Sequence, residues 1–344
     1  MKTVTVNASK SYEIKIGPGL LATLGEEAKL LGKARKIAIV SESNVYPLYG
    51  PRAENSLQEA GFDVASFVFP AGEESKCAVT YLELLNFLAE NKLTRSDLIV
   101  ALGGGVVGDL AGFAAATYLR GIRFIQIPTT LLAMVDSSVG GKTAIDLPAG
   151  KNLVGAFWQP SLVICDTDTL TSLPREIFRD GCAEVIKYGI LYDEAFFSYL
   201  EATGPDFDRE AVIARCVQMK RDVVMEDEFD TGARMKLNLG HTIGHGVEAS
   251  SNFTLSHGKS VAIGIAIVSR ASHCPANERI IGILQKFGLP TSSLTDADTL
   301  FTYALSDKKR SGGTVNLIIP HRIGNCEIVP TPVEKIKSFI EEGL

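Results

Sequence analysis

The sequence predicts an α/β fold with an N-terminal domain built on a parallel sheet and a mainly α-helical C-terminal domain. Short β-rich runs alternate with stretches of helical periodicity through the first half of the chain, as in a parallel sheet with crossover helices. From about residue 174 the periodicity becomes almost entirely helical. A chain of 344 residues with 46% hydrophobic side chains can form two cores, so we expect domains at residues 1–173 and 174–344.

The individual elements follow from these patterns in order. The first ten residues, MKTVTVNASK, alternate polar and apolar side chains and predict a strand, not a signal peptide. Helices are expected at 79–92 and 108–119, and the acidic tract 225–230 is expected to be a solvated helix end or loop. A final helix should follow the last strand. The remaining expected strands are 36–41, 64–70, 98–105, 124–130, 162–166, 314–320 and 326–330.

Charge and cysteine content exclude several classes of protein. With 34 basic and 40 acidic residues the net charge is −6, so we expect neither nucleic acid nor a membrane surface as a partner. No run of about 18 apolar residues predicts a membrane span. Six scattered cysteines without a CxxC pair are typical of buried thiols in a reducing compartment, which predicts a cytoplasmic protein.

A glycine-rich turn follows the expected strand 98–105. Gly103, Gly105 and Gly108 match G-x-G-x-x-G, and a helix is expected to begin around Gly108, so its backbone N–H groups could face a pyrophosphate. On spacing alone, a tight strand-to-helix turn explains the glycines equally well. Glu42 and Asn44 favour a dinucleotide, because they end another expected strand, where a ribose diol needs an acceptor.

Three of the five histidines lie within seventeen residues. His241 and His245 are four residues apart on one helical face, and His257 follows, a set that can bind a metal ion together with a carboxylate. Glu184 is the candidate carboxylate, since it interrupts an apolar helical stretch. An ion pair with Lys187 is the alternative explanation for Glu184. The spacing does not decide which of the three histidines are ligands.

Several cations occur in polar or glycine-containing segments. Lys142 and Lys151 are expected in loops at the carboxyl edge of the sheet, where small neighbours favour close contact with a ligand. Any single lysine of an acidic protein is by default only solvated. A substrate carrying both phosphate and carboxylate would need several cations, and the further candidates are Arg120, Lys220, Arg234, Lys308 and Lys309.

The run PTTLLAMVDSSVGGKTA, preceded by GGGVVGD and followed by CAEVIKYG and LNLGHTIGHGVE, resembles the 3-dehydroquinate synthase family. The resemblance extends in collinear order from about Pro70 to Pro320. It implies a homodimer that uses NAD and one divalent metal ion, zinc or cobalt, with the active site in the cleft between its domains. The implied reaction converts 3-deoxy-D-arabino-heptulosonate 7-phosphate to 3-dehydroquinate and phosphate by transient oxidation, phosphate elimination, re-reduction and aldol closure.

The same resemblance assigns roles to individual residues. It implies Glu184, His241 and His257 as metal ligands, and His245, Asp230, Lys142, Arg234 and Asn238 as catalytic residues. The implied substrate-binding residues are Arg120, Asp136, Lys142, Lys151, Asn152, Lys187, Lys220, Arg234, Asn238, Lys308 and Lys309, with Arg120 reaching across the dimer interface and one of the two last lysines joining it. The implied NAD-binding residues are Glu42, Asn44, Glu73, Lys76, Gly104, Gly105, Val106, Asp109, Thr129, Thr130, Leu132, Asp136, Ser137, Lys142 and Lys151.

Two positions depart from the family pattern. Glu42 stands where many members have Asp, and Asp230 stands where many have Glu, which leaves a proton-acceptor role at Asp230 open. The alternatives are another sugar-phosphate cyclase, a metal-dependent polyol dehydrogenase, or a non-catalytic NAD-binding protein. The DSSVGGKTA segment and the combination of metal and substrate positions favour the synthase.

Overall fold

In a computed structural model that describes residues 1–251, 254–306 and 313–344, the chain forms two compact units. Unit 1 comprises Met1–Pro174 and Arg209–Phe229, and unit 2 comprises Arg175–Asp208 and Asp230–Leu344. The amino-acid sequence predicts one division of the chain, near residue 174. The structure differs at residues 209–229, which pack with unit 1 although they lie in the second half of the sequence.

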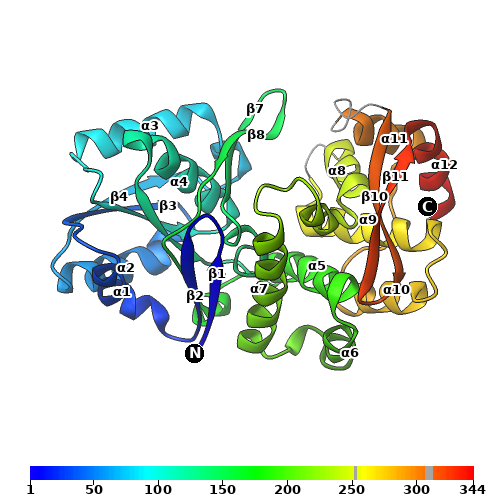
Figure 1. The fold of residues 1–344 in the computed structure, drawn as a ribbon, viewed down its shortest axis with the longest axis horizontal. Coiled ribbons are helices and arrows are strands. Elements are labelled where there is room, and N and C mark those ends of the chain that lie inside the picture. Colours follow the sequence, from blue (N-terminus) through cyan, green and yellow to red (C-terminus); the bar gives the residue numbers. More distant parts are fainter. Residues whose placement is uncertain (252–253, 307–312) are drawn as a thin grey trace. The chain divides into compact units, whose positions relative to one another are not determined.

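Unit 1 is built on a seven-stranded sheet in the order β1-β2-β9-β6-β5-β3-β4, in which only β1 is antiparallel to its neighbour. The antiparallel pair β1 and β2 is dark blue in Figure 1. The strands are β1 (Lys2–Asn7), β2 (Ser11–Gly17), β3 (Lys36–Glu42), β4 (Asp63–Phe69), β5 (Leu98–Gly103), β6 (Arg123–Pro128) and β9 (Leu162–Asp166). The helices are η1 (Leu20–Thr23), α1 (Leu24–Leu30), α2 (Tyr46–Glu59), η2 (Glu73–Ser75), α3 (Ala78–Glu90), α4 (Gly105–Thr117), η3 (Tyr118–Arg120), η4 (Ala133–Ser137), η5 (Thr167–Thr171) and α7 (Arg209–Glu226).

Successive side chains of the central strands enter two different cores. On β3, Ile37 and Ile39 pack in the core that includes α1 and α2, whereas Ala38 and Val40 pack in the core that includes α3 and α4. All four side chains are fully buried. A strand that is buried on both faces needs an uninterrupted apolar run, which is why KIAIV was recognisable in the sequence.

The expected start of α4 at Gly108 is wrong by one turn, because the helix begins at Gly105, directly after the glycine turn.

The expectation of loops around Lys142 and Lys151 is also wrong. Residues 142–157 form an antiparallel hairpin of β7 (Lys142–Leu147) and β8 (Gly150–Phe157), in which Lys142 lies opposite Phe157. Pro148 and Ala149 form its tip, and a proline at this point fixes a backbone angle suited to a turn.

Unit 2 is mainly helical, and its described residues include an antiparallel hairpin of β10 and β11. Its buried side chains lie mostly on α5, α8 and α9, and these helices carry the candidate metal ligands. No helix among the described residues is long and apolar enough to cross a lipid bilayer. The elements of unit 2 are α5 (Arg175–Tyr192), α6 (Glu194–Thr203), η6 (Gly204–Asp206), η7 (Ala233–Asn238), α8 (His241–Ser250), α9 (His257–Ala271), α10 (Asn277–Lys286), α11 (Ala297–Ser306), β10 (Thr314–Arg322), β11 (Asn325–Pro332) and α12 (Val333–Gly343).

Candidate functional site

The order of the strands creates a switch point in unit 1. The chain runs from β3 to β4 on one side of β3 and then returns to β5 on its other side. In open parallel sheets, ligands bind at the carboxyl ends of the two strands that flank such a point. Glu42 ends β3 and Gly103 ends its neighbour β5, so the two motifs that favoured a dinucleotide meet at this position.

The glycine turn leaves backbone donors at the start of α4. Gly104 caps this thirteen-residue helix, whose first-turn N–H groups have no carbonyl of the preceding turn to bond. A Cβ atom at Gly104 would lie 3.2 Å from Thr130, and one at Gly105 would lie 3.3 Å from Ser137, so side chains would crowd the turn. Thr129 Oγ1 is buried and has no hydrogen-bond partner in the described chain. These features fit a pyrophosphate that accepts hydrogen bonds from the turn.

Other residues expected to bind the dinucleotide surround this turn. The backbone N–H of Asn44 donates to Glu42 Oε2 at 2.7 Å, which fixes the carboxylate at the end of β3. Val106 lies in the first turn of α4, and Leu132 precedes the short helix η4, which carries Ser137. Thr129 and Thr130 directly follow β6, which pairs with β5.

Lys76 brings several expected residues into one charged network. Its Nζ lies 2.9 Å from Glu73 Oε1, 3.2 Å from Asp109 Oδ2 and 2.7 Å from Asn152 Oδ1. Lys151 Nζ lies 4.0 Å from the same Glu73 oxygen. Burial opposes the charged form of Lys76, but the surrounding carboxylates outweigh it and raise its pKa, so Lys76 stays cationic.

The acidic members of this network differ in their pKa. Burial raises the pKa of Asp109 to about 6, although Lys76 opposes the shift. For Glu73, burial is outweighed by the charge and hydrogen bond of Lys76, which lower its pKa. Asp146, which the sequence analysis missed, accepts a hydrogen bond from the backbone N–H of Asn152 at 2.7 Å and lies 3.7 Å from Lys76 Nζ.

Unit 1 also positions residues expected to contact the substrate. Lys220 on α7 is buried and donates to Asp136 Oδ1 on η4 at 2.7 Å, because α7 packs against η4 in this unit. Lys142 is exposed at the start of β7. Arg120 is exposed after α4 with a φ of +65°, and it makes no hydrogen bond or ion pair with any residue that the structure describes.

In unit 2, Glu184, His241 and His257 form a compact donor set. One ligand atom from each lies within 4.8 Å of the others, and Glu184 Oε1 is 3.4 Å from His241 Nε2 and 3.5 Å from His257 Nε2. Ligands that bind a tetrahedral zinc ion at about 2.1 Å stand about 3.4 Å from one another. The donor types and their spacing therefore fit a divalent metal ion.

Neighbouring groups orient all three donors. Lys187 Nζ forms the expected ion pair with Glu184 Oε2. The other carboxylate oxygen, Oε1, faces the histidines, so the ion pair does not prevent Glu184 from being a ligand. His241 Nδ1 lies 3.1 Å from the carbonyl oxygen of Leu239, and His257 Nδ1 lies 3.4 Å from Glu248 Oε2. Ligating histidines commonly use one ring nitrogen in this way, which directs the other nitrogen at the ion.

The pKa values of the two histidines diverge. Burial, aided by the charge of Lys187, lowers the pKa of His241 to about 3, so this imidazole is neutral and able to ligate. Burial also disfavours charge on His257, but hydrogen bonds to Glu184 and Glu248 outweigh it and raise its pKa to about 10. A divalent ion would take the place of the proton on His257 Nε2.

His245 lies beside this donor set, and the other expected residues of unit 2 lie on η7, just before it, or outside the described residues. His245 is exposed, and its ring centroid is 5.5 Å from that of His241 and 6.1 Å from that of His257. Arg234 is buried on η7, which ends at Asn238, and Asp230 precedes this helix with a φ of +60°. Lys308 and Lys309 lie outside the residues that the structure describes.

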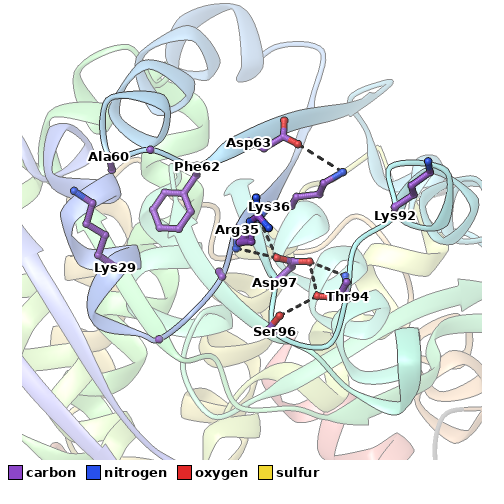
Figure 2. A pocket seen from close by; sticks show the side chains of 13 residues that line it. Lys29, Arg35, Lys36, Ala60, Phe62, Asp63, Lys92, Thr94, Ser96 and Asp97 are labelled. Atoms are coloured by element: carbon purple, nitrogen blue, oxygen red, sulfur yellow. Dashed lines mark hydrogen bonds and ion pairs between the residues drawn. The ribbon is translucent and has the colours of Figure 1, made fainter.

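A basic recess of about 560 Å³ lies elsewhere on unit 1 (Figure 2). Lys29, Arg35, Lys36 and Lys92 contribute to its lining, together with Asp97. It lies where β3, β4 and β5 begin, whereas the glycine turn lies where β3 and β5 end. None of the expected site residues lines it, so we do not assign it to the candidate active site.

Two residues of the site, Glu248 and Asp146, were not predicted from the sequence. Glu248 follows His245 by three residues and His241 by seven, so helical spacing could have found it on the same face of α8. Asp146 carries no comparable signal, because its contact with Lys76 depends on how the β7–β8 hairpin packs.

Comparison with solved structures defines the class of protein. A 2-deoxy-scyllo-inosose synthase, complexed with carbaglucose-6-phosphate, NAD⁺ and Co²⁺, matches with a TM-score of 0.88 and 26% identity over 100% of both chains. The 2-epi-5-epi-valiolone synthase of Streptomyces hygroscopicus subsp. jinggangensis 5008, with NAD⁺ and Zn²⁺ bound, matches with a TM-score of 0.88 and 25% identity over 98% of both chains. The fold is that of the sugar-phosphate cyclases.

Sequence comparisons identify the family within this class. Models described as 3-dehydroquinate synthase N-terminal and C-terminal match residues 66–180 and 181–310. The 3-dehydroquinate synthase of Pelobacter propionicus is 45% identical over 98% of both chains. The chain belongs to the 3-dehydroquinate synthase family.

Proposed function

We propose that this chain catalyses the reaction of its family, the conversion of 3-deoxy-D-arabino-heptulosonate 7-phosphate to 3-dehydroquinate and phosphate. The observation that carries the proposal is the donor set of Glu184, His241 and His257, whose spacing suits a divalent ion. The strand order of unit 1 adds a switch point of the kind at which parallel sheets bind dinucleotides. When bound, NAD supplies a reversible hydride acceptor and the divalent ion, zinc or cobalt, supplies a Lewis acid.

Unit 1 would hold NAD at the glycine turn. The first-turn N–H groups of α4 and the hydroxyl of Thr129 would bond the pyrophosphate, and Glu42 would accept hydrogen bonds from a ribose. The network around Lys76, with Asp109 and Glu73, would fix the remaining end of the cofactor. The other residues proposed to line this site are Asn44, Gly104, Gly105, Val106, Thr130, Leu132, Asp136, Ser137, Lys142 and Lys151.

Unit 2 would hold the metal ion through Glu184 Oε1, His241 Nε2 and His257 Nε2. Lys187 fixes the second oxygen of Glu184, and Glu248 fixes the ring of His257. Three protein ligands leave coordination positions for substrate oxygens.

Cations would bind the phosphate and carboxylate of the substrate. In a chain of net charge −6 this attraction has to be local, and Lys142, Lys151, Lys187, Lys220 and Arg234 are the proposed donors. They stabilise the charge that develops as phosphate leaves, and Asp136, Asn152 and Asn238 hold substrate hydroxyls. His245 beside the metal donors and Asp230 before η7 are the proposed proton-transfer groups.

We also propose a cytoplasmic homodimer. Arg120 is exposed and makes no hydrogen bond or ion pair with another described residue, which suits a guanidinium that reaches a neighbouring subunit's phosphate. One of Lys308 and Lys309 would join it.

Phosphate release tests the proposed function. Purified protein is mixed with 3-deoxy-D-arabino-heptulosonate 7-phosphate, NAD and zinc or cobalt, with and without a chelator, while NADH absorbance is followed. Phosphate and 3-dehydroquinate should appear together, depend on the metal and leave no stoichiometric NADH. Accumulation of NADH with a simple polyol and no phosphate would instead identify a polyol dehydrogenase.

A further inference from the structure

Met225, Glu226 and Phe229 of the acidic segment at the end of α7 are exposed as expected, but Glu228 in the same segment is hydrogen-bonded to other parts of unit 1. Glu228 Oε2 accepts a hydrogen bond from the backbone N–H of Ser9 at 2.7 Å, and Glu228 Oε1 accepts from Ser9 Oγ at 2.5 Å. Gln159 Nε2 donates to the same Oε1 at 2.8 Å. Short bonds of this kind to a carboxylate are the stronger class of hydrogen bond. One side chain thus connects the β1–β2 turn with the end of the β7–β8 hairpin.

Glu228 and Phe229 contact Gln159 and Phe157, and these two residues lie against the start of β7. Phe229 meets Phe157 edge to face, with ring centroids 5.3 Å apart, and Phe157 lies opposite Lys142 in the hairpin register. Gln159, which bonds Glu228, packs against Gly141, where an added Cβ would come within 3.0 Å of the Gln159 amide group. Gly141 immediately precedes Lys142, so both contacts converge on the backbone that carries this lysine.

The backbone changes direction directly after these contacts. Phe229 is the last residue of unit 1, and Asp230, the next residue, has a φ of +60°. A left-handed backbone at a residue other than glycine persists where the surrounding structure determines it, and such residues cluster at functional sites. The contacts of Glu228 and Phe229 hold the two residues that precede this backbone.

We propose that Glu228, Phe229, Gln159 and Phe157 form a clasp that fixes the point where the chain leaves unit 1 beside Lys142, and thereby fixes the carboxylate of Asp230. Glu228 and Phe229 are positioning residues in this arrangement, because they act through Asp230 and Lys142. The inference rests on the proposed function, which gives both of those residues a place in the chemistry. A shift of about 1 Å in a reacting group can lower turnover by about 100-fold, so such an anchor has a measurable effect.

The first test compares Glu228→Ala with Glu226→Ala, a matched change at the exposed end of α7. Turnover (kcat) of Glu228→Ala should fall on the order of 10- to 100-fold, while KM, zinc content and NAD affinity change little. Glu228→Gln keeps one acceptor oxygen and should recover part of the loss. Glu226→Ala should match the native protein. Native kcat in Glu228→Ala, or an equal loss in Glu226→Ala, would overturn the proposal.

A double-mutant cycle with Asp230→Asn separates positioning from general structural damage. If Glu228 acts through Asp230, then Glu228→Ala should lower kcat by less than about 3-fold in the Asp230→Asn background. The full loss in that background would overturn the proposal, and so would native turnover of Asp230→Asn alone. In the second case metal-dependent phosphate release persists, so the proposed function of the chain stands while the clasp fails.

Hydrogen exchange tests the clasp without any activity. Amide exchange measured by mass spectrometry should become faster in Glu228→Ala over residues 8–10 and 227–232. These two segments are distant in sequence, since Ser9 and Glu228 are 219 positions apart, and the hydrogen bond between these two residues joins them. Glu226→Ala should leave both segments as in the native protein. Unchanged exchange in Glu228→Ala would overturn the clasp. Absence of phosphate release from the native protein would refute the proposed function separately.

Discussion

Glu248→Gln should weaken zinc binding although Glu248 is not among the three candidate ligands. Glu248 is buried, and its Oε2 lies 3.4 Å from His257 Nδ1, so the native carboxylate orients the imidazole that faces Glu184. The amide of glutamine keeps an acceptor oxygen of the same reach but loses the charge. A hydrogen bond to a charged group contributes about 1.5–3 kcal/mol, against about 0.5–1.5 kcal/mol for a neutral one.

The two ranges differ by about 1–1.5 kcal/mol when their corresponding ends are compared. We expect about 1.4 kcal/mol, which is a tenfold rise in the Kd for zinc and agrees with the 10- to 100-fold range for partners of metal-ligating histidines. The assay is competition for zinc with a chromophoric chelator at fixed pH. Glu327→Gln is the matched control, because Glu327 also pairs with a histidine, His321, at 2.8 Å but on an exposed surface of unit 2.

The control should bind zinc as the native protein does. A Kd for Glu248→Gln within twofold of the native value would refute the reasoning, since it would show that His257 is oriented without this carboxylate. An equal weakening in Glu327→Gln would also refute it, because the effect would then come from lost negative charge anywhere in the unit.

Three further predictions concern other parts of the molecule. His257→Ala should abolish zinc retention and phosphate release together, and full metal content with normal turnover would reject its role as a ligand. Arg120→Ala should raise KM for the phosphorylated substrate and leave NAD affinity unchanged, and an unchanged KM would argue against a phosphate contact. Asp97→Asn should lower the free energy of unfolding by about 1–3 kcal/mol at pH 7, because the buried carboxylate accepts hydrogen bonds from Arg35, Lys36 and Thr94. These bonds outweigh burial and lower the pKa of Asp97, so its contribution to the free energy of unfolding is present above about pH 4 and is lost as the pH falls further. Denaturation at pH 7 and at pH 3 should therefore show a smaller difference in the free energy of unfolding between the two proteins at pH 3. A difference that stays constant would contradict the assignment.

The parts of the fold that could be predicted are those fixed by local patterns. The buried strand β3 shows as an apolar run, and the turn after β5 shows as three consecutive glycines. The pair His241 and His245 shows by its four-residue spacing. Each of these signals reflects local backbone geometry, which depends on the residue types within a few positions of one another.

The choice among the three histidines could not be predicted from spacing. His241 and His245 share a face of α8, but the third donor begins α9, and only the packing of α8, α9 and α5 brings His257 and Glu184 to His241. His245 is offset from that point and exposed. Periodicity identifies the face of a helix but not the element that the face meets, so a ligand set drawn from three helices requires the tertiary structure.

The tertiary contacts of the acidic segment at residues 225–230 could not be predicted from the sequence either. Residues 225–230 have the composition of a solvated loop, yet Glu228 is fixed by two segments that are distant in sequence. The cause is α7, whose buried face packs against β1, β2 and η4, so the chain returns to unit 1 before it continues into η7. That return also brings Lys220 to Asp136. A helix from the second half of the sequence thus completes the charged surroundings of unit 1, and the residues after it enter unit 2 from an anchored position.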